Sequence, residues 1–251
     1  IKDDFNTLLN SRFSEQTILL SDKIFCWGKY DYDSLINLFP NQKQKFIKTG
    51  NPRVSLWSRK YKNLFINKII EEKKYILISS NFSVAVSSKR LSGMVKYFLS
   101  TNYFSDKNYV ENFYNRMSLN LQILFKFISA INILTERFQN INFIVRPHPT
   151  ESVELWTNFF RKRKNLLITK EFTHSDWIEN SEIIIHNGCT AGVEAFARKK
   201  KIISYEPLDL KTSHTYPNKF GYTAKDEIEL QNLISQFYCN DKRYQKIDEI
   251  Q

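Results

Sequence analysis

The chain has 251 residues, enough for one large domain or two small ones. Its formal net charge is +11, which favours anionic partners such as phosphate groups, acidic glycans or lipid head groups, although a general compositional bias toward Lys explains it equally well. Hydrophobic residues make up 42% of the chain, which excludes general disorder. We see no nucleic-acid motif, and we expect no membrane-spanning segment.

The cysteines and the start of the chain bear on its compartment. Cys26, Cys189 and Cys239 are far apart and form no CxxC pair, which disfavours a metal or disulfide framework and favours a reducing cytoplasm. The chain begins at Ile1 without a signal-like segment, so we expect a piece or a processed form of a longer protein.

Short apolar runs alternate with helical patterns along the chain, which predicts an α/β fold with a Rossmann-like parallel sheet. We expect strands over residues 23–27, 45–48, 75–79, 141–145, 166–169, 182–186 and 201–205. We expect helices over residues 31–39, 109–138, 153–164, 173–180, 190–198 and 226–238. A long polar loop over residues 80–106 is a candidate functional segment, and a second loop is expected over residues 207–222.

The order of these elements also predicts the domains. We expect residues 1–57 to be the tail of an N-terminal lobe and residues 58–73 to be a linker helix. Residues 74–240 would form one Rossmann-like lobe, followed by a tail over residues 241–251.

The first candidate site is the turn that follows the predicted strand 182–186. Its residues are Asn187, Gly188, Cys189 and Thr190, and Glu194 follows one helical turn later. Gly188 permits close approach of a ligand, Thr190 is a good N-cap or phosphate donor, and the first-turn N–H groups attract anions. A carboxylate at Glu194 could accept bonds from ribose hydroxyls. A capped core helix is the equally weighted alternative.

The second candidate is the turn Arg146-Pro147-His148-Pro149, which follows the predicted strand 141–145. The two prolines fix the backbone, so Arg146 and His148 point in set directions at a strand end. Arg146 could bind a phosphate or carboxylate, and His148 could donate to a phosphate or protonate a leaving group. The alternative is a rigid turn whose histidine is satisfied by a backbone carbonyl.

Other polar residues receive local roles. We expect His186 to be a satisfied core histidine, Glu151 to cap the following helix, and His174 and Asp176 to cap theirs. Asp31 is a candidate cap of the helix over residues 31–39. Asn51 and Arg53 lie in a tight turn from which Arg53 could reach an interlobe cleft. No carboxylate cluster suggests a metal site, and no HExxH, GxSxG, GxxxxGK[ST] or GxGxxG motif occurs.

Together these motifs resemble those of the bacterial surface carbohydrate biosynthesis protein family. The matching segments include VRPHPTE at Val145–Glu151 and HNGCTAGVEA at His186–Ala195, in this order. Supporting matches are the WG pair at 27–28, TGNPR at 49–53, the NF pair at Asn81-Phe82, ISYEP at 203–207 and YPN at 216–218.

The resemblance implies a branch of the GT-B glycosyltransferases, and more distantly a likeness to bacterial Kdo and sialic-acid transferases. It implies the C-terminal lobe of a GT-B architecture, preceded by only the tail of the N-terminal lobe. His148 and the Cys189-Thr190 turn would then hold a phosphate, Glu194 the ribose and Arg146 would assist, with Asn81 beside them. The Asn187–Thr190 turn replaces the Ser/Thr-rich turn of those distant relatives.

We therefore predict a metal-independent glycosyltransferase of bacterial surface polysaccharide biosynthesis, located in the cytoplasm or at the inner face of the membrane. The donor is a nucleotide-sugar, with a CMP-linked acidic sugar as one candidate, and no other cofactor is expected. The acceptor is a glycan or lipid-linked glycan, and contact with the membrane surface is left open. The alternatives are a nucleotide-sugar isomerase of the epimerase type and a non-catalytic module that binds anionic glycan.

Overall fold

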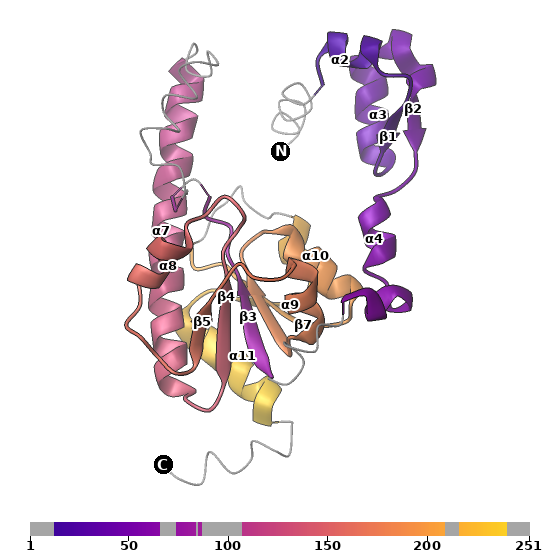
Figure 1. Cartoon of the computed structure of the whole chain (residues 1–251). Helices are drawn as coiled ribbons and strands as arrows, with labels where there is room; N and C mark the ends of the chain where they lie inside the picture. The colour runs from indigo at the N-terminus through magenta and orange to yellow at the C-terminus, as the bar shows by residue number, and fades with distance from the viewer. Residues whose placement is uncertain (1–12, 66–73, 84, 87–106, 209–215, 240–251) are drawn as a thin grey trace. The chain divides into compact units, whose positions relative to one another are not determined.

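The computed structural model describes residues 13–65, 74–83, 85–86, 107–208 and 216–239 (Figure 1). The chain divides into two compact units, Ile1–Tyr61 and Lys62–Gln251. The division falls inside the segment expected to be a linker helix. Its described part is a 3-10 helix, Arg59–Phe65, and residues 66–73 lie outside the described residues.

The smaller unit is a β-α-β arrangement. Strands β1 (Ile24–Cys26) and β2 (Phe46–Lys48) pair in parallel, and helix α3 (Lys29–Leu38) connects them through a 3-10 turn, Pro40–Lys45. Its core contains Ile18 of helix α2 (Glu15–Leu20). The prediction that Asp31 caps the helix is wrong, because the helix begins at Lys29 and Gly28 is the N-cap.

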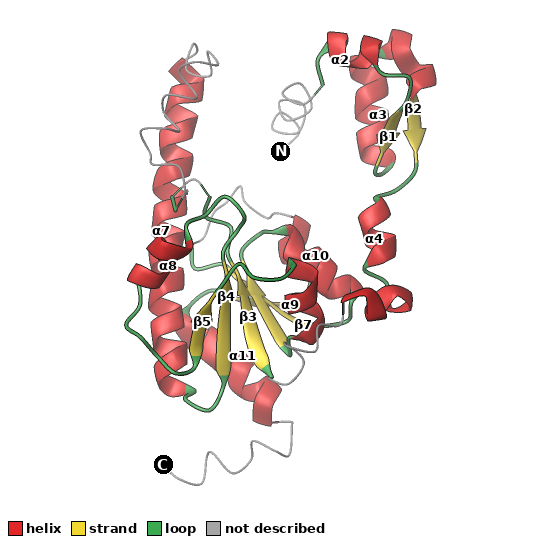
Figure 2. Ribbon diagram, in the orientation of Figure 1, coloured by secondary structure: helices red, strands yellow, loops and turns green. Residues whose placement is uncertain are grey.

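The larger unit contains a six-stranded sheet in the order β5-β4-β3-β6-β7-β8, with every pair parallel (Figure 2). The strands are β3 (Tyr75–Ser79), β4 (Asn142–Arg146), β5 (Leu166–Ile168), β6 (Ile183–His186), β7 (Lys201–Tyr205) and β8 (Tyr222–Ala224). The predicted Rossmann-like α/β fold is confirmed. Strand β8 was missed because it lies between the end of the predicted loop 207–222 and the predicted helix 226–238.

Helices cover both faces of this sheet. Alternate strand residues pack on one face against α7 (Lys107–Arg137), α8 (Val153–Asn158) and α11 (Glu227–Cys239). The other residues pack on the opposite face against α9 (His174–Asn180) and α10 (Thr190–Ala197). Because both faces are covered, the strands are almost continuously apolar, as is typical of parallel sheets.

Helix α8 is shorter than expected. It ends at Asn158 and not at residue 164, so the basic run over 161–164 does not end a helix and cannot act on its dipole. The ring of Trp156 is fully buried and contacts the rings of Phe159 and Phe160. Both phenylalanines are partly buried and pack against the same core cluster as Trp156.

Helix α7 is the one candidate for a membrane span in the part of the chain that the structure describes. The segment Phe113–Arg137 passes by length and composition, with a mean hydropathy of 1.5 in its best window. Its residues Leu124, Phe127, Ile131 and Leu134 belong to the sheet core, while only 33% of the window is buried. Contact with a membrane stays a prediction.

Candidate nucleotide site at the carboxyl edge of the sheet

Four neighbouring strands have a polar residue at or next to their carboxyl end, and these residues lie at the same edge. Ser79 of β3 lies in register with Arg146 of β4 and with His186 of β6, and His186 lies in register with Ser204 of β7. Paired residues of parallel strands face the same side, so this row lies on the α9–α10 face. Apolar strands thus give way to a polar row where the chain turns into loops and helices.

The strand order locates the expected ligand position. From β3 the chain proceeds to β4 and β5 on one side, then returns to β6, β7 and β8 on the other. The reversal lies between β3 and β6, and in open parallel sheets ligands bind outside the carboxyl ends of the strands at such a switch point. The segment after β3 contains Asn81, and the segment after β6 contains residues 187–190. Of the two predicted turns, Asn187–Thr190 therefore lies at the switch point, and Arg146–Pro149 leaves the same edge from β4, the strand next to β3.

Glu151 fixes the segment after β3. Its fully buried carboxylate accepts bonds from Ser80 Oγ (2.5 Å), the Phe82 amide (2.5 Å) and Trp156 Nε1 (2.7 Å). The predicted capping role of Glu151 is wrong, because Ser152 is the N-cap of α8. Sequence reasoning missed this bridge, although the NF pair and the Glu of VRPHPTE were both recognised as motif residues.

His148 is held at the edge with one ring nitrogen available. Its backbone amide donates to Ser80 Oγ (3.1 Å). Its Nδ1 lies 2.8 Å from Thr150 Oγ1 and accepts a bond from the Thr150 amide at 3.3 Å. With Nδ1 accepting, the neutral ring carries its proton on Nε2, for which the described residues provide no partner. The exposed side chain can therefore donate outward from Nε2.

Arg146 has a structural task in this arrangement. Its Nη1 donates to the Thr169 carbonyl (3.0 Å) and its Nη2 to the Phe172 carbonyl (2.6 Å). These bonds hold the segment between β5 and α9, in which Phe172 adopts a φ of 57°. Burial lowers the pKa of Arg146, but the guanidinium stays charged near pH 7. Arg146 therefore adds positive charge to the edge, while its hydrogen bonds hold the loop between β5 and α9.

His174 joins the edge from α9, a position that sequence reasoning gave to local capping. Its Nε2 lies 2.8 Å from Ser79 Oγ. Burial lowers its pKa to about 4, and the charges of Arg146 and His148 add to this effect. Asp176 does cap as predicted, because it forms a capping box with Thr173. Near pH 7 the ring of His174 is therefore neutral, and the charge that favours an anion at the ends of β3 and β4 comes from Arg146.

The turn after β6 begins a helix without a side-chain cap. Gly188 has a φ of 63°, and its amide donates to Asn218 Oδ1 (2.7 Å), which joins the NGCT turn to the YPN motif. Cys189 is the N-cap of α10, and its side chain makes no cap hydrogen bond. Thr190, predicted as a candidate N-cap, is instead the first helical residue and is exposed. Asn187 is half-buried.

Cys189 is an unreactive type of thiol. Burial raises its pKa to about 11, although the Ala191 and Gly192 amides act in the opposite direction. The thiol therefore carries its proton near pH 7, and it packs against the sheet core on the α9–α10 face. It contributes shape and backbone to the turn and no charge.

Glu194 faces α9. Its Oε1 accepts from Arg198 Nε at 3.0 Å, and Arg198 Nη1 also binds Glu179 Oε2 at 2.8 Å. Burial raises the pKa of Glu194, while hydrogen bonds from Ser175 and Arg198 oppose the rise. This network joins the two helices. A ribose contact of Glu194 stays a prediction, and it would need further bonds beside those to Arg198.

The remaining predicted residues divide between the two units. Asn81 is exposed beside Phe82 at the edge just described. Asn51 is the N-cap of helix α4 (Pro52–Leu56), where its Oδ1 accepts from the Arg53 amide at 3.0 Å. The interlobe role of Asn51 and Arg53 stays a prediction. Within the described residues, no three His, Cys, Asp or Glu side chains gather as metal ligands would.

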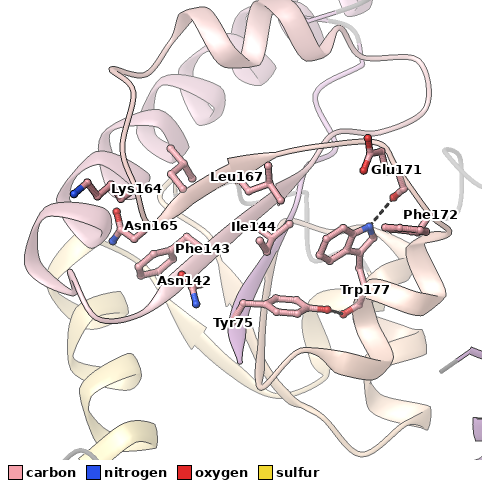
Figure 3. A pocket seen from close by; sticks show the side chains of 11 residues that line it. Tyr75, Asn142, Phe143, Ile144, Lys164, Asn165, Leu167, Glu171, Phe172 and Trp177 are labelled. Carbon is pink, nitrogen blue, oxygen red and sulfur yellow. Dashed lines mark hydrogen bonds between the residues drawn. The ribbon is translucent and has the colours of Figure 1, made fainter. Parts of the chain in front are cut away.

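A separate cavity of about 390 Å³ lies along the α9 side of β3, β4 and β5 (Figure 3). Tyr75 Oη donates to the Trp177 carbonyl (2.7 Å), and Trp177 Nε1 donates to the Glu171 carbonyl (2.7 Å). These polar atoms are thereby satisfied, and the wall is mainly aromatic and aliphatic. Sequence reasoning gave no sign of this cavity, because three strands, helix α9 and the segments on both sides of β5 form it.

The chain matches known proteins in structure and not in sequence. No protein-family model matches the sequence, and no curated protein matches it. Solved structures do match. The UDP-GlcNAc 2-epimerase of Methanocaldococcus jannaschii, in complex with UDP-GlcNAc and UDP, gives a TM-score of 0.52 at 16% identity, over 90% of this chain and 57% of that one.

Two further structures match at a similar level. The wall teichoic acid polymerase TagF, soaked with CDPG, gives a TM-score of 0.53 at 12% identity, over 92% of this chain and 52% of that one. A putative UDP-N-acetylglucosamine 2-epimerase from Listeria monocytogenes gives a TM-score of 0.51 at 12% identity, over 96% of this chain and 59% of that one. The chain spans little more than half the length of these proteins. At these identities the likeness shows the fold alone: a Rossmann-like α/β fold with neighbours of GT-B architecture.

Proposed function

We propose that the chain is the nucleotide-sugar-binding part of an enzyme of surface glycan biosynthesis, and that its reaction is glycosyl transfer. The observation that carries this proposal is the convergence of His148, Arg146 and His174 on the strand ends beside the uncapped N-terminus of α10. The positive charge of Arg146, the Nε2 donor of His148 and the unpaired helix N–H groups together favour a phosphate. Neighbours of the same fold were solved with UDP-GlcNAc and with CDPG, which supports a nucleotide ligand.

In this proposal the donor phosphate lies between the two turns. His148 Nε2 donates to a phosphate oxygen, and the amides of Thr190 and Ala191 donate from the opposite side. Arg146 adds charge from behind the edge without leaving the carbonyls of Thr169 and Phe172. When the glycosidic bond to the nucleotide breaks, negative charge grows on the phosphate, and preorganised donors stabilise it more than they stabilise the bound substrate.

Binding of CMP, CDP, UDP and GDP to the purified chain tests the proposal. We expect at least one nucleotide to raise the melting temperature and to bind in titration calorimetry. His148→Ala should weaken that binding by about tenfold, since one hydrogen bond to a charged group is lost. Lys162→Ala is the matched control: this exposed cation lies beyond α8, and its loss should leave affinity nearly unchanged. Failure of every nucleotide to bind would refute the proposal.

An isomerase of the epimerase type is the second candidate, since epimerases are among the structural neighbours. The two reactions differ in their need for an acceptor. Incubation with UDP-GlcNAc alone, followed by ¹H NMR of the sugar ring, would reveal a new epimer if the chain were an isomerase. A glycosyltransferase leaves the donor unepimerised under the same conditions.

A further inference from the structure

His186 is a buried residue to which the proposed function assigns no role. It ends β6, has no exposed surface, and its ring lies on the α9–α10 face. Neither Nδ1 nor Nε2 has a hydrogen-bond partner among the described residues, and Ser204 Oγ on the next strand has none either. We predicted a core histidine whose hydrogen bonds are satisfied. His186 is in the core, but the prediction about its hydrogen bonds is wrong. Unpaired buried polar atoms reduce stability, so such a residue needs an explanation.

The ring lies directly beneath the first turn of α10. An ideal Cβ on Gly192 would lie 2.4 Å from His186 Nε2 and 2.6 Å from Cε1, and real Cβ atoms essentially never approach another atom within 3.0 Å. Glycine is among the least favourable residues inside a helix, but here it alone leaves room for the imidazole. The helix backbone thus rests on the ring.

This contact acts on the part of α10 that would bind the ligand. Gly192 is the third residue of the helix, and its amide donates to the Cys189 carbonyl at 3.1 Å. The position of the His186 ring therefore determines how far the first turn of α10 lies from the sheet. This turn contains the amides of Thr190 and Ala191. Burial lowers the pKa of His186 to about 4. The ring is thus neutral near pH 7 and does not repel the positive end of the helix.

We propose that His186 is a positioning residue, whose ring under Gly192 fixes the first turn of α10 at the height at which its amides meet the donor phosphate. The inference rests on the proposed function, because the ligand of the turn is taken to be a nucleotide. Ile184, two residues earlier on the same face of β6, belongs to the same core cluster as Ala191 of α10. His186 thus links the packed sheet to the binding edge.

The test compares Gly192→Ala, His186→Ala and the double variant in the whole chain. UDP and CMP affinities are measured by calorimetry, and the amide resonances of Thr190–Gly192 are followed by NMR. We expect Gly192→Ala to shift these amides and to weaken nucleotide binding about tenfold. His186→Ala alone removes the support under the turn and should also shift these amides and weaken binding. In the double variant the added methyl occupies part of the space of the ring, so the amides and most of the affinity should return. That rescue distinguishes displacement of the turn from a general effect of the new methyl group.

Ile202→Ala is the matched control. It removes buried volume from β7 on the α9–α10 face of the sheet, the face on which the ring of His186 also lies. It should lower the melting temperature and leave nucleotide affinity unchanged. If Gly192→Ala binds the nucleotide as tightly as the unaltered chain, the inference is overturned and the proposed function stands. If neither UDP nor CMP binds the unaltered chain, the proposed function fails and the inference fails with it.

Discussion

Glu151 offers the sharpest test of how the carboxyl edge is held together. Its carboxylate receives three buried donors: Ser80 Oγ and Trp156 Nε1 on one oxygen, and the Phe82 amide on the other. Glu151→Gln keeps the size of the side chain but replaces one acceptor oxygen by a donor. In either orientation the new amide faces at least one donor, so at least one charge-assisted bond is lost.

The expected loss follows from that count. One hydrogen bond to a charged group contributes about 1.5 to 3 kcal/mol, and the easier burial of a neutral amide offsets part of this. We expect Glu151→Gln to lower the free energy of unfolding by about 2 kcal/mol. Urea unfolding of the larger unit, followed by far-ultraviolet circular dichroism, measures the change.

A double-mutant cycle isolates the bond itself. Trp156→Phe removes the indole donor, so combining it with Glu151→Gln should show a coupling energy of about 1 kcal/mol or more. Trp177→Phe is the control, because its indole also donates from a buried position, but to the Glu171 carbonyl and outside the Glu151 network. The reasoning is refuted if Glu151→Gln costs less than about 0.5 kcal/mol, or if Glu151 couples equally to both tryptophans.

Three further predictions concern titration, reactivity and backbone conformation. The pKa of His186 is lowered to about 4 in the folded chain, from a value near 6.5 in the unfolded chain. The neutral ring's contribution to the free energy of unfolding is therefore fully present above about pH 6.5 and is lost as the pH falls toward 4. Because of this residue, we expect the free energy of unfolding to fall by about 2 kcal/mol between pH 7.5 and pH 5. His186→Asn should flatten the pH profile of urea unfolding. An unchanged profile would contradict the assignment. Burial raises the pKa of Cys189 to about 11, so iodoacetamide should modify this thiol far more slowly in native protein than in urea-unfolded protein. Peptide mass spectrometry measures the two rates. Equal rates would show that the thiol is accessible. Gly188→Ala should cost about 1 to 2 kcal/mol in urea unfolding, because the φ of 63° is unfavourable for alanine, whereas an unchanged midpoint would mean that the turn does not need this conformation.

The succession of strands and helices was predictable from local pattern. Parallel strands buried on both faces are continuously apolar, and runs such as Tyr75–Ser79 and Ile183–His186 stand out against their polar turns. The same logic placed the RPHP and NGCT turns at one edge, because parallel strands end together. Strand β8 escaped because only Ala224 of its three residues is buried, so it forms no apolar run. The end of α8 escaped because Trp156 and Phe160 are at helical spacing, although the helix ends at Asn158.

The partners of the side chains were decided by tertiary structure alone. The sequence marked Glu151 and Arg146 as notable residues, but Glu151 bonds Phe82 across 69 positions of sequence and Arg146 holds a loop 23 or more residues away. His174 reaches Ser79 over 95 positions. Such contacts leave no local pattern, because they depend on which strands are neighbours. The contact between His186 and Gly192 is of the same kind: the sequence shows a histidine and a glycine six residues apart, and only the packing of α10 on β6 makes each restrict the other.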